Sequence, residues 1–138
     1  MSSADLGTGL FAWAQSLAPL TDIIGEGDDC QFYPEALQSQ KTPPFVLYDE
    51  QKDEEAAKHD SAPTAATTTI TFTCIAATRA DAVALADVIY QALIVPRFKG
   101  LMGDVYVQSV IYKKSNPSYE WEEYQWAVES EYVFCYNL

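Results

Sequence analysis

The chain has 138 residues, which suits one domain, and 49% of them are hydrophobic, which is enough to build a core. Twenty acidic residues stand against eight basic ones, so the net charge is −12 at pH 7. This excess of acidic residues argues against nucleic-acid binding, which needs clustered Lys and Arg, and against docking on anionic membranes.

The sequence carries no pattern typical of export, membrane insertion or metal binding. Met1–Leu10 lack a basic region and a sustained apolar stretch, so we expect no signal peptide, and no run reaches transmembrane length. Cys30, Cys74 and Cys135 are odd in number and far apart, so we expect small buried side chains in a reducing cytoplasm. We expect no metal site and no cofactor, because closely spaced Cys and His ligands are missing.

The first predicted element is a helix over residues 5–24. Its apolar side chains recur at helical spacing along one face: Leu6, Leu10, Trp13, Ala14 and Leu17. Pro19 is expected to end or break this helix and to leave a short turn through Ile23 and Ile24. Gly25 and Gly27 mark a turn, and the acids that follow them exclude a phosphate loop.

An extended region and a charged loop come next. Phe32–Pro34 is a short extended piece, and Pro43-Pro44 holds the backbone extended before Phe45–Tyr48. That segment is apolar on both faces and is predicted as a central strand. Residues 49–66 hold six acids and two lysines without periodicity, which predicts a long exposed acidic loop. The loop is either a solvated excursion or an arm that contacts a partner.

The clearest pattern is a strand followed by a capped helix. Residues 67–78 alternate, with one apolar face made by Ile70, Phe72, Cys74 and Ala76. Thr78 is the expected N-cap of a helix over Arg79–Ile94, with Asp81 as an acidic third residue. The apolar stripe of this helix consists of Ala82, Leu85, Ala86, Ile89 and Leu93.

The remaining sequence predicts a terminal hairpin. After a loop with Gly100 and Gly103, Val105–Lys113 is a strand, Asn116–Ser118 a turn, and Tyr124–Tyr136 the last strand. The expected order is α-β-β-α-β-β. It predicts an α+β fold class, with an antiparallel or mixed sheet and two helices packed on one face, in a single domain over residues 1–138.

Few residues suggest chemistry. His59 is the single histidine and has no nucleophile motif to serve, and adjacent acids such as Glu122-Glu123 lack the spacing of a calcium loop. We therefore expect no catalytic residue and no enzyme. The candidate partner-interface residues are charged or aromatic: Asp53, Glu54, Glu55, Trp121 and Trp126. The two tryptophans serve either as interface anchors or as core packing at one end of the sheet.

Five segments in a fixed order carry a resemblance to a known family. They are Leu6–Leu17 with Pro19–Gly25, Phe32–Pro34, Pro44–Tyr48, Thr78–Ala82, and a terminal hairpin over Val105–Leu138. In this order and spacing, the chain resembles the tail-terminator or tail-completion proteins of long-tailed bacteriophages, including the lambda-type terminators. The resemblance spans nearly the whole chain.

The resemblance implies a hexameric ring that caps the finished tail tube, ends tail polymerisation and offers a platform to the head–tail connector proteins. It implies assembly in the host cytoplasm and a place at the head-proximal end of the virion tail. An acidic lumen would let DNA pass without specific binding. Three alternatives stay open: a head–tail adaptor or head-closure protein, a tail-tube-like subunit, and a small regulatory module with an apolar pocket.

Overall fold

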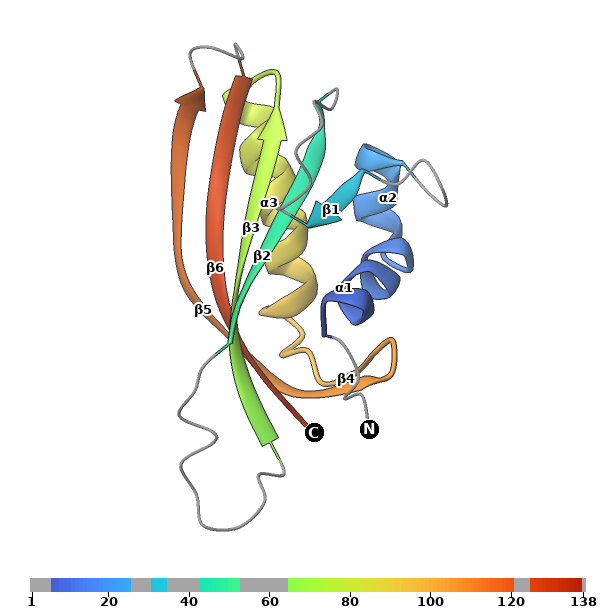
Figure 1. Ribbon diagram of the computed structural model, residues 1–138. Helices are drawn as coiled ribbons and strands as arrows, with labels where there is room; N and C mark the ends of the chain where they lie inside the picture. Colours follow the sequence, from blue (N-terminus) through green and yellow to red (C-terminus); the bar gives the residue numbers. More distant parts are fainter. Residues whose placement is uncertain (1–5, 26–30, 35–42, 53–64, 121–124, 138) are drawn as a thin grey trace.

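The computed structural model describes residues 6–25, 31–34, 43–52, 65–120 and 125–137. Its elements follow one another along the chain as three helices and six strands within these residues (Figure 1). In order they are α1 (Leu6–Gln15), α2 (Ala18–Ile24), β1 (Phe32–Pro34), β2 (Phe45–Lys52), β3 (Ala65–Ala76), α3 (Arg79–Leu93), β4 (Gly100–Met102), β5 (Val105–Glu120) and β6 (Gln125–Asn137).

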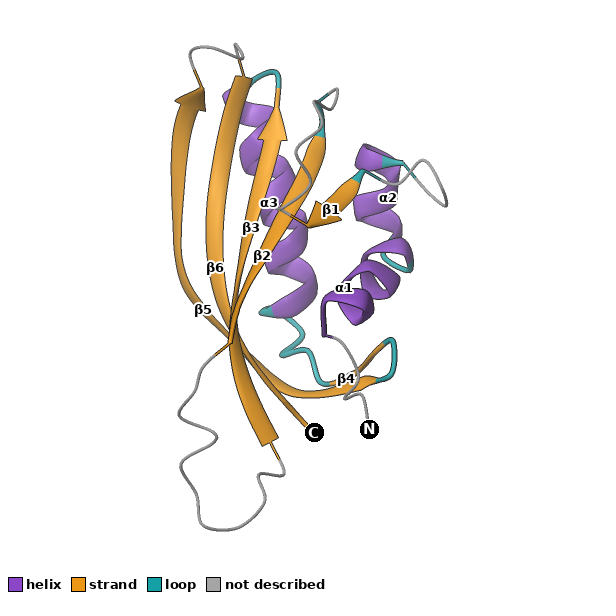
Figure 2. Cartoon of the chain, in the orientation of Figure 1, coloured by secondary structure: helices purple, strands orange, loops and turns teal. Residues whose placement is uncertain are grey.

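The strands form one curved, mixed sheet in the order β1-β2-β3-β6-β5-β4. β1 runs parallel to β2, and every other neighbouring pair is antiparallel. The helices lie on one face of this sheet, with α3 along its middle and α1 and α2 towards β1 and β4 (Figure 2). The predicted α+β class and mixed sheet are therefore confirmed, whereas the predicted order with two helices and four strands is wrong.

The first predicted helix is in fact two helices. Pro19 lies in the first turn of α2, where its missing N–H has no helical partner to lose and its fixed backbone angle suits helix initiation. Ser16 donates to the carbonyl oxygens of Ala12 and Trp13 and closes the end of α1. The proline thus starts a second helix, where the sequence predicted only a short turn.

Of the two short strands, β1 coincides with the predicted extended piece, whereas β4 was missed. β1 is three residues long, and Phe32 and Pro34 pair with Val46 and Tyr48 of β2. β4 lies in the segment that was predicted as a glycine loop, and a tight turn at Gly103, with φ of 61°, connects it to β5. α1 approaches this hairpin so closely that a Cβ atom at Gly9 would overlap the Met102 carbonyl oxygen. Such short strands form through contacts that no local pattern encodes.

The predicted turn at Asn116–Ser118 is wrong, because β5 continues through Pro117 to Glu120. Pro117 is paired in register with Val128 of β6. β4 pairs only with residues 105–107 of β5, so in the described part of the chain the rest of β5 is an edge strand. An edge strand tolerates proline, since the missing N–H faces away from the sheet.

The predicted loop over residues 49–66 is shorter than expected. β2 continues through Lys52, and Asp49–Lys52 pair with Thr68–Thr71 of β3. β3 begins at Ala65, so the strands occupy both ends of the segment. The acidic residues between them, with His59, lie outside the described residues.

The core lies between α3 and the β3–β6 pair. The predicted stripe of α3 is buried in full, and so is the predicted apolar face of β3. β6 adds Tyr132 and Phe134, both with no exposed surface. The Thr78 hydroxyl accepts a hydrogen bond from the Asp81 N–H at 3.2 Å, which confirms the predicted N-cap. Helix phase, strand phase and cap were therefore all correct here.

This packing predicts a graded loss of stability. Leu85→Ala should lower the free energy of unfolding by about 2–5 kcal/mol, because it leaves a cavity in a closed core. Thr78→Ala should cost about 0.5–2 kcal/mol through the lost cap. Urea unfolding would measure both, with the exposed Val83→Ala as a control that stays within about 0.5 kcal/mol of the parent. Equal values for Leu85→Ala and the control would contradict the packing.

Candidate functional site

Most of the predicted interface residues are not placed by the structure. Asp53, Glu54, Glu55 and Trp121 lie outside the described residues, and their role stays a prediction. Trp126 is half-buried near the start of β6 and packs against the core. The Arg79 guanidinium lies 5.9 Å from the centre of its ring, so the side chain also carries a cation–π contact at the start of α3.

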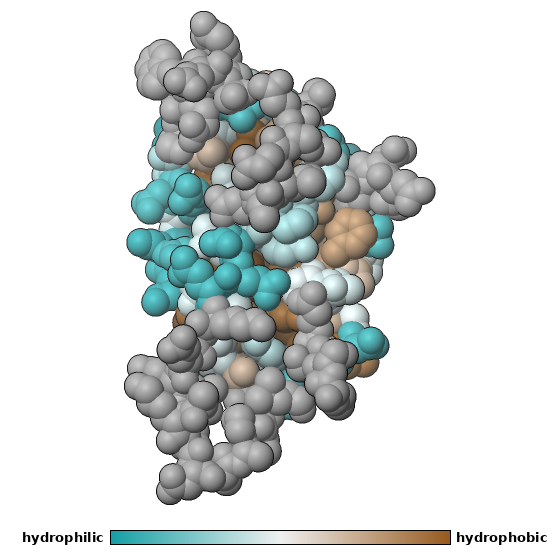
Figure 3. Space-filling view, in the orientation of Figure 1, coloured by the Kyte–Doolittle hydropathy of each residue, from teal (hydrophilic) through white to brown (hydrophobic). Residues whose placement is uncertain are grey.

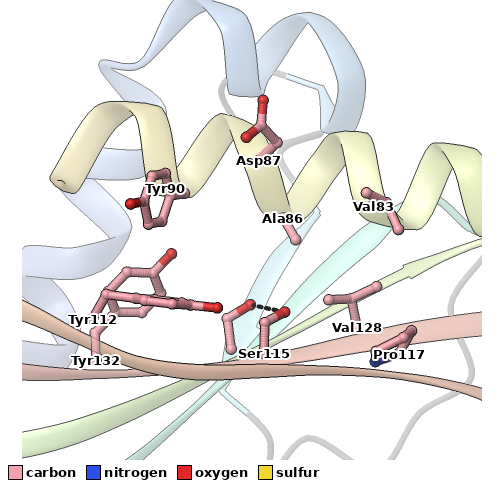
Figure 4. A pocket seen from close by; sticks show the side chains of 10 residues that line it. Val83, Ala86, Asp87, Tyr90, Tyr112, Ser115, Pro117, Val128 and Tyr132 are labelled. Carbon is pink, nitrogen blue, oxygen red and sulfur yellow. Dashed lines mark hydrogen bonds between the residues drawn. The ribbon is translucent and has the colours of Figure 1, made fainter. Parts of the chain in front are cut away.

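A groove opens between α3 and the β5–β6 hairpin (Figure 4). Val83 and Ala86 form its helix side, and Pro117 and Val128 form its sheet side. The cavity volume is about 380 Å³, which is within the range of pockets that hold a side chain or a small molecule. It exists because the facing side chains are short: Ala86, Ser115 and Ser130 cannot fill the distance between helix and sheet.

Three tyrosines close one end of the groove. Tyr90 and Tyr112 meet edge to face with ring centres 5.1 Å apart, and Tyr112 lies 5.4 Å from Tyr132. The Tyr132 hydroxyl is buried and has no hydrogen-bond partner in the described residues. Burial raises the pKa of this phenol, and the Cys74 thiol and the Tyr112 and Tyr90 phenols add to the rise. Tyr132 is therefore a neutral donor at physiological pH.

The serines on the floor of the groove satisfy each other. Ser115 and Ser130 face one another across β5 and β6, and their hydroxyl oxygens are 3.2 Å apart (Figure 4). The floor is thus polar but paired, whereas Val83, Pro117 and Val128 give the groove apolar walls. Such a surface accepts an aliphatic or aromatic group better than a charged one.

The opposite face of the sheet is polar. Side chains from β2, β3, β5 and β6 line a depression of about 280 Å³ there, and Lys114 and Glu131 form a cross-strand ion pair at 3.3 Å. Figure 3 shows hydrophilic side chains gathered over one side of the molecule. No group of His, Cys, Asp or Glu among the described residues could hold a metal ion. Nor does any helix in the described ranges have the length and apolar character to span a membrane.

A small apolar cluster lies on this second face. Phe45, Ile75 and Ala127 are buried there, with Tyr33 and Leu47 packed against them, whereas Val46 points into the main core. β2 is therefore apolar on both faces and pairs on both sides, as the sequence predicted. Cys74 is buried, as expected, and its pKa is raised to about 12 by burial. Cys135 is only half-buried.

The groove itself was not found from the sequence. Val83 is an apolar residue on the solvent side of the predicted helix, and it is 45% exposed. Pro117 was assigned to a turn and belongs to an edge strand. The sequence offered two hints of this groove: an exposed Val on a helix, and a proline within a long alternating strand. Neither of them indicates a groove by itself.

Comparison with known proteins gives one informative result. No protein-family model matches the chain, and no curated protein matches it. Among solved structures, a chain described as "Virion of native gene transfer agent (GTA) particle" shares the fold, with a TM-score of 0.66 and 16% sequence identity. The match covers 99% of this chain and 100% of that chain, so the two share one architecture from end to end.

The buried tyrosines predict a contrast between two matched substitutions. Tyr136→Phe removes a buried hydrogen bond of 2.9 Å to Thr68 and should cost about 1–3 kcal/mol, because the Thr68 hydroxyl is left without a partner. Tyr132→Phe removes a hydroxyl that has no hydrogen-bond partner among the described residues, so stability should be unchanged or higher. Denaturant unfolding of both variants would measure the difference. A larger loss for Tyr132→Phe would show that its hydroxyl is bonded in solution.

Proposed function

We propose that the chain is a structural subunit of a phage-like virion, and that within it the chain acts as the tail terminator. The observation that carries the proposal is the fold, which is shared over both full lengths with a chain from a virion. The proposed role is that of a ring that caps the tail tube and joins it to the head connector. No catalytic role is proposed.

The part of β5 beyond its pairing with β4 is an edge within the described residues, and this edge supports a subunit that ends polymerisation. A strand that propagates a tube by strand pairing must offer regular unpaired N–H and C=O groups. β5 instead carries a register shift between Tyr112 and Lys114, two lysines, and Pro117. Lysine, a bulge and proline on an edge strand all oppose the addition of another strand. Such an edge suits a ring of fixed size better than an open-ended tube.

Charge supports the proposed position in the path of DNA. A ring of chains with a net charge of −12 repels phosphate, so DNA can pass without sticking. The proposed partners are further copies of the chain in a hexamer, the tail tube protein, and the head–tail connector proteins. The proposed location is the head-proximal end of the tail, reached after assembly in the host cytoplasm.

A head-side adaptor or head-closure protein is the second candidate. The name of the similar structure describes a whole particle and fits a head or a tail component equally. The two roles differ in one activity, because only a terminator stops the growth of tail tubes. A tail-tube-like subunit would instead add to them.

The proposal predicts a hexamer at high protein concentration and a smaller oligomer or a monomer on dilution. Native mass spectrometry at several ionic strengths should show more ring as salt rises, because salt screens the repulsion between acidic subunits. Addition of the protein to polymerising tail tube protein from the same virus should shorten the tubes seen by electron microscopy. A stable dimer under all conditions, or tubes of unchanged length, would contradict the terminator role.

A further inference from the structure

The groove between α3 and β5 lacks a cover in the described part of the chain. Its walls include Val83, which is 45% exposed, and Tyr112, which is 37% exposed. An open groove with apolar walls and a few polar groups is the kind of concave surface in which proteins bind a ligand or a partner's side chain. The occupant must fit between a helix and a strand, beside an edge that resists strand addition. A side chain projecting from a helix meets both conditions.

A matching projection lies at the other side of the subunit. α2 lies towards β1, at the end of the sheet away from β5 (Figure 1). Ile23 in its last turn is 39% exposed. The other exposed large hydrophobic residues of the described chain come from α3 onwards, and of these Val83 and Tyr112 line the groove, whereas Val95, Leu101, Tyr106 and Ile111 do not. A ring of identical subunits joins two different surfaces of each copy head to tail. The groove and Ile23 are therefore placed as two such surfaces.

We propose that α2 of one copy docks on the groove of the next copy in the ring, with Ile23 inserted against Val83 and Tyr112. This inference rests on the proposed ring. The docked isoleucine removes its own apolar surface and that of the groove walls from water. The short side chains of Ala86 and Ser115 provide the space that it enters.

Charge agrees with this occupant. Asp22 precedes Ile23 and is exposed, and Lys113, which follows the groove residue Tyr112 along β5, is exposed as well. Lys114 forms the ion pair with Glu131, and within the described residues Lys113 forms none. Pairing Asp22 of one copy with Lys113 of the next offsets part of the repulsion between acidic subunits and sets the orientation of the contact. Asp87 at the groove rim would repel an acidic segment docked in the reverse orientation.

The decisive experiment uses two variants that each damage one surface. Ile23→Asp removes the projection, and Ser115→Phe fills the groove. Each should weaken association by about tenfold or more and give monomers where the parent forms rings. An equimolar mixture of the two variants should form one-to-one dimers, because each contributes one intact surface and the dimer cannot extend further. Native mass spectrometry separates these species.

Two controls test folding and specificity. Circular dichroism of each variant should match the parent, and at a concentration where the parent is monomeric each variant should still melt in one cooperative transition. Val95→Asp, an exposed change in the loop after α3, should leave rings intact. Asp22→Lys and Lys113→Glu should each reduce the ring fraction at low salt, and the double exchange should restore it. Failure of the exchange to restore rings would overturn the charged pair.

Tube capping separates this inference from the function on which it rests. If the parent forms rings and caps tubes while Ile23→Asp does both equally well, the docking proposal is wrong and the terminator role stands. If Ser115→Phe forms rings but no longer caps tubes, the groove binds the tube protein, and the proposal is again wrong. A parent that neither forms rings nor caps tubes would overturn both.

Discussion

The packing of α3 on the β3–β6 pair is the interaction on which the rest of the structure depends. β3 and β6 pair along their full common length, from Ala65 with Asn137 to Ala76 with Trp126. Their inner faces bury Ile70, Phe72 and Phe134 against one continuous stripe of the helix. Every other element is added to this layer: β2 and β1 on one side, β5 and β4 on the other, with α1 and α2 covering the remaining core.

The same packing explains why the groove exists. Large side chains at Phe72, Tyr132 and Phe134 fill the distance between α3 and the middle of the sheet, and this distance is then set for the whole helix. Towards β5 the helix presents Val83 and Ala86 and the sheet presents Ser115, so the same distance is left partly unfilled. A packed interior does not collapse around such a gap when its neighbours are rigid. The groove is thus a consequence of side-chain size.

Where periodicity was strong and the contacts local, the sequence was sufficient. The alternation of β3, the stripe of α3 and the Thr78 cap each needed only neighbouring residues, and all three were predicted. β1 and β4 form by pairing with other segments of the chain, which no local pattern predicts. Pro117 was assigned to a turn, where proline is common, but an edge strand tolerates proline as well. The groove could not be predicted, because it forms only where the short side chains of Ala86, Ser115 and Ser130 face one another and leave the space between helix and sheet unfilled. Sequence patterns describe what is buried better than what is left empty.

Net charge and the apolar surfaces have opposing effects on assembly. At −12 per chain, every subunit added to the proposed ring would raise its electrostatic free energy, and at physiological salt this repulsion is screened only beyond about 8 Å. Contacts between subunits in such a ring must therefore be short-ranged and apolar, and they must use the few basic side chains of the chain. Lys113 follows the groove residue Tyr112 along β5, and in the proposed contact it offsets part of this repulsion. Strong acidity opposes association in dilute solution, so the proposed ring forms at high protein concentration or where a partner surface, such as the end of a tail tube, adds its own contacts.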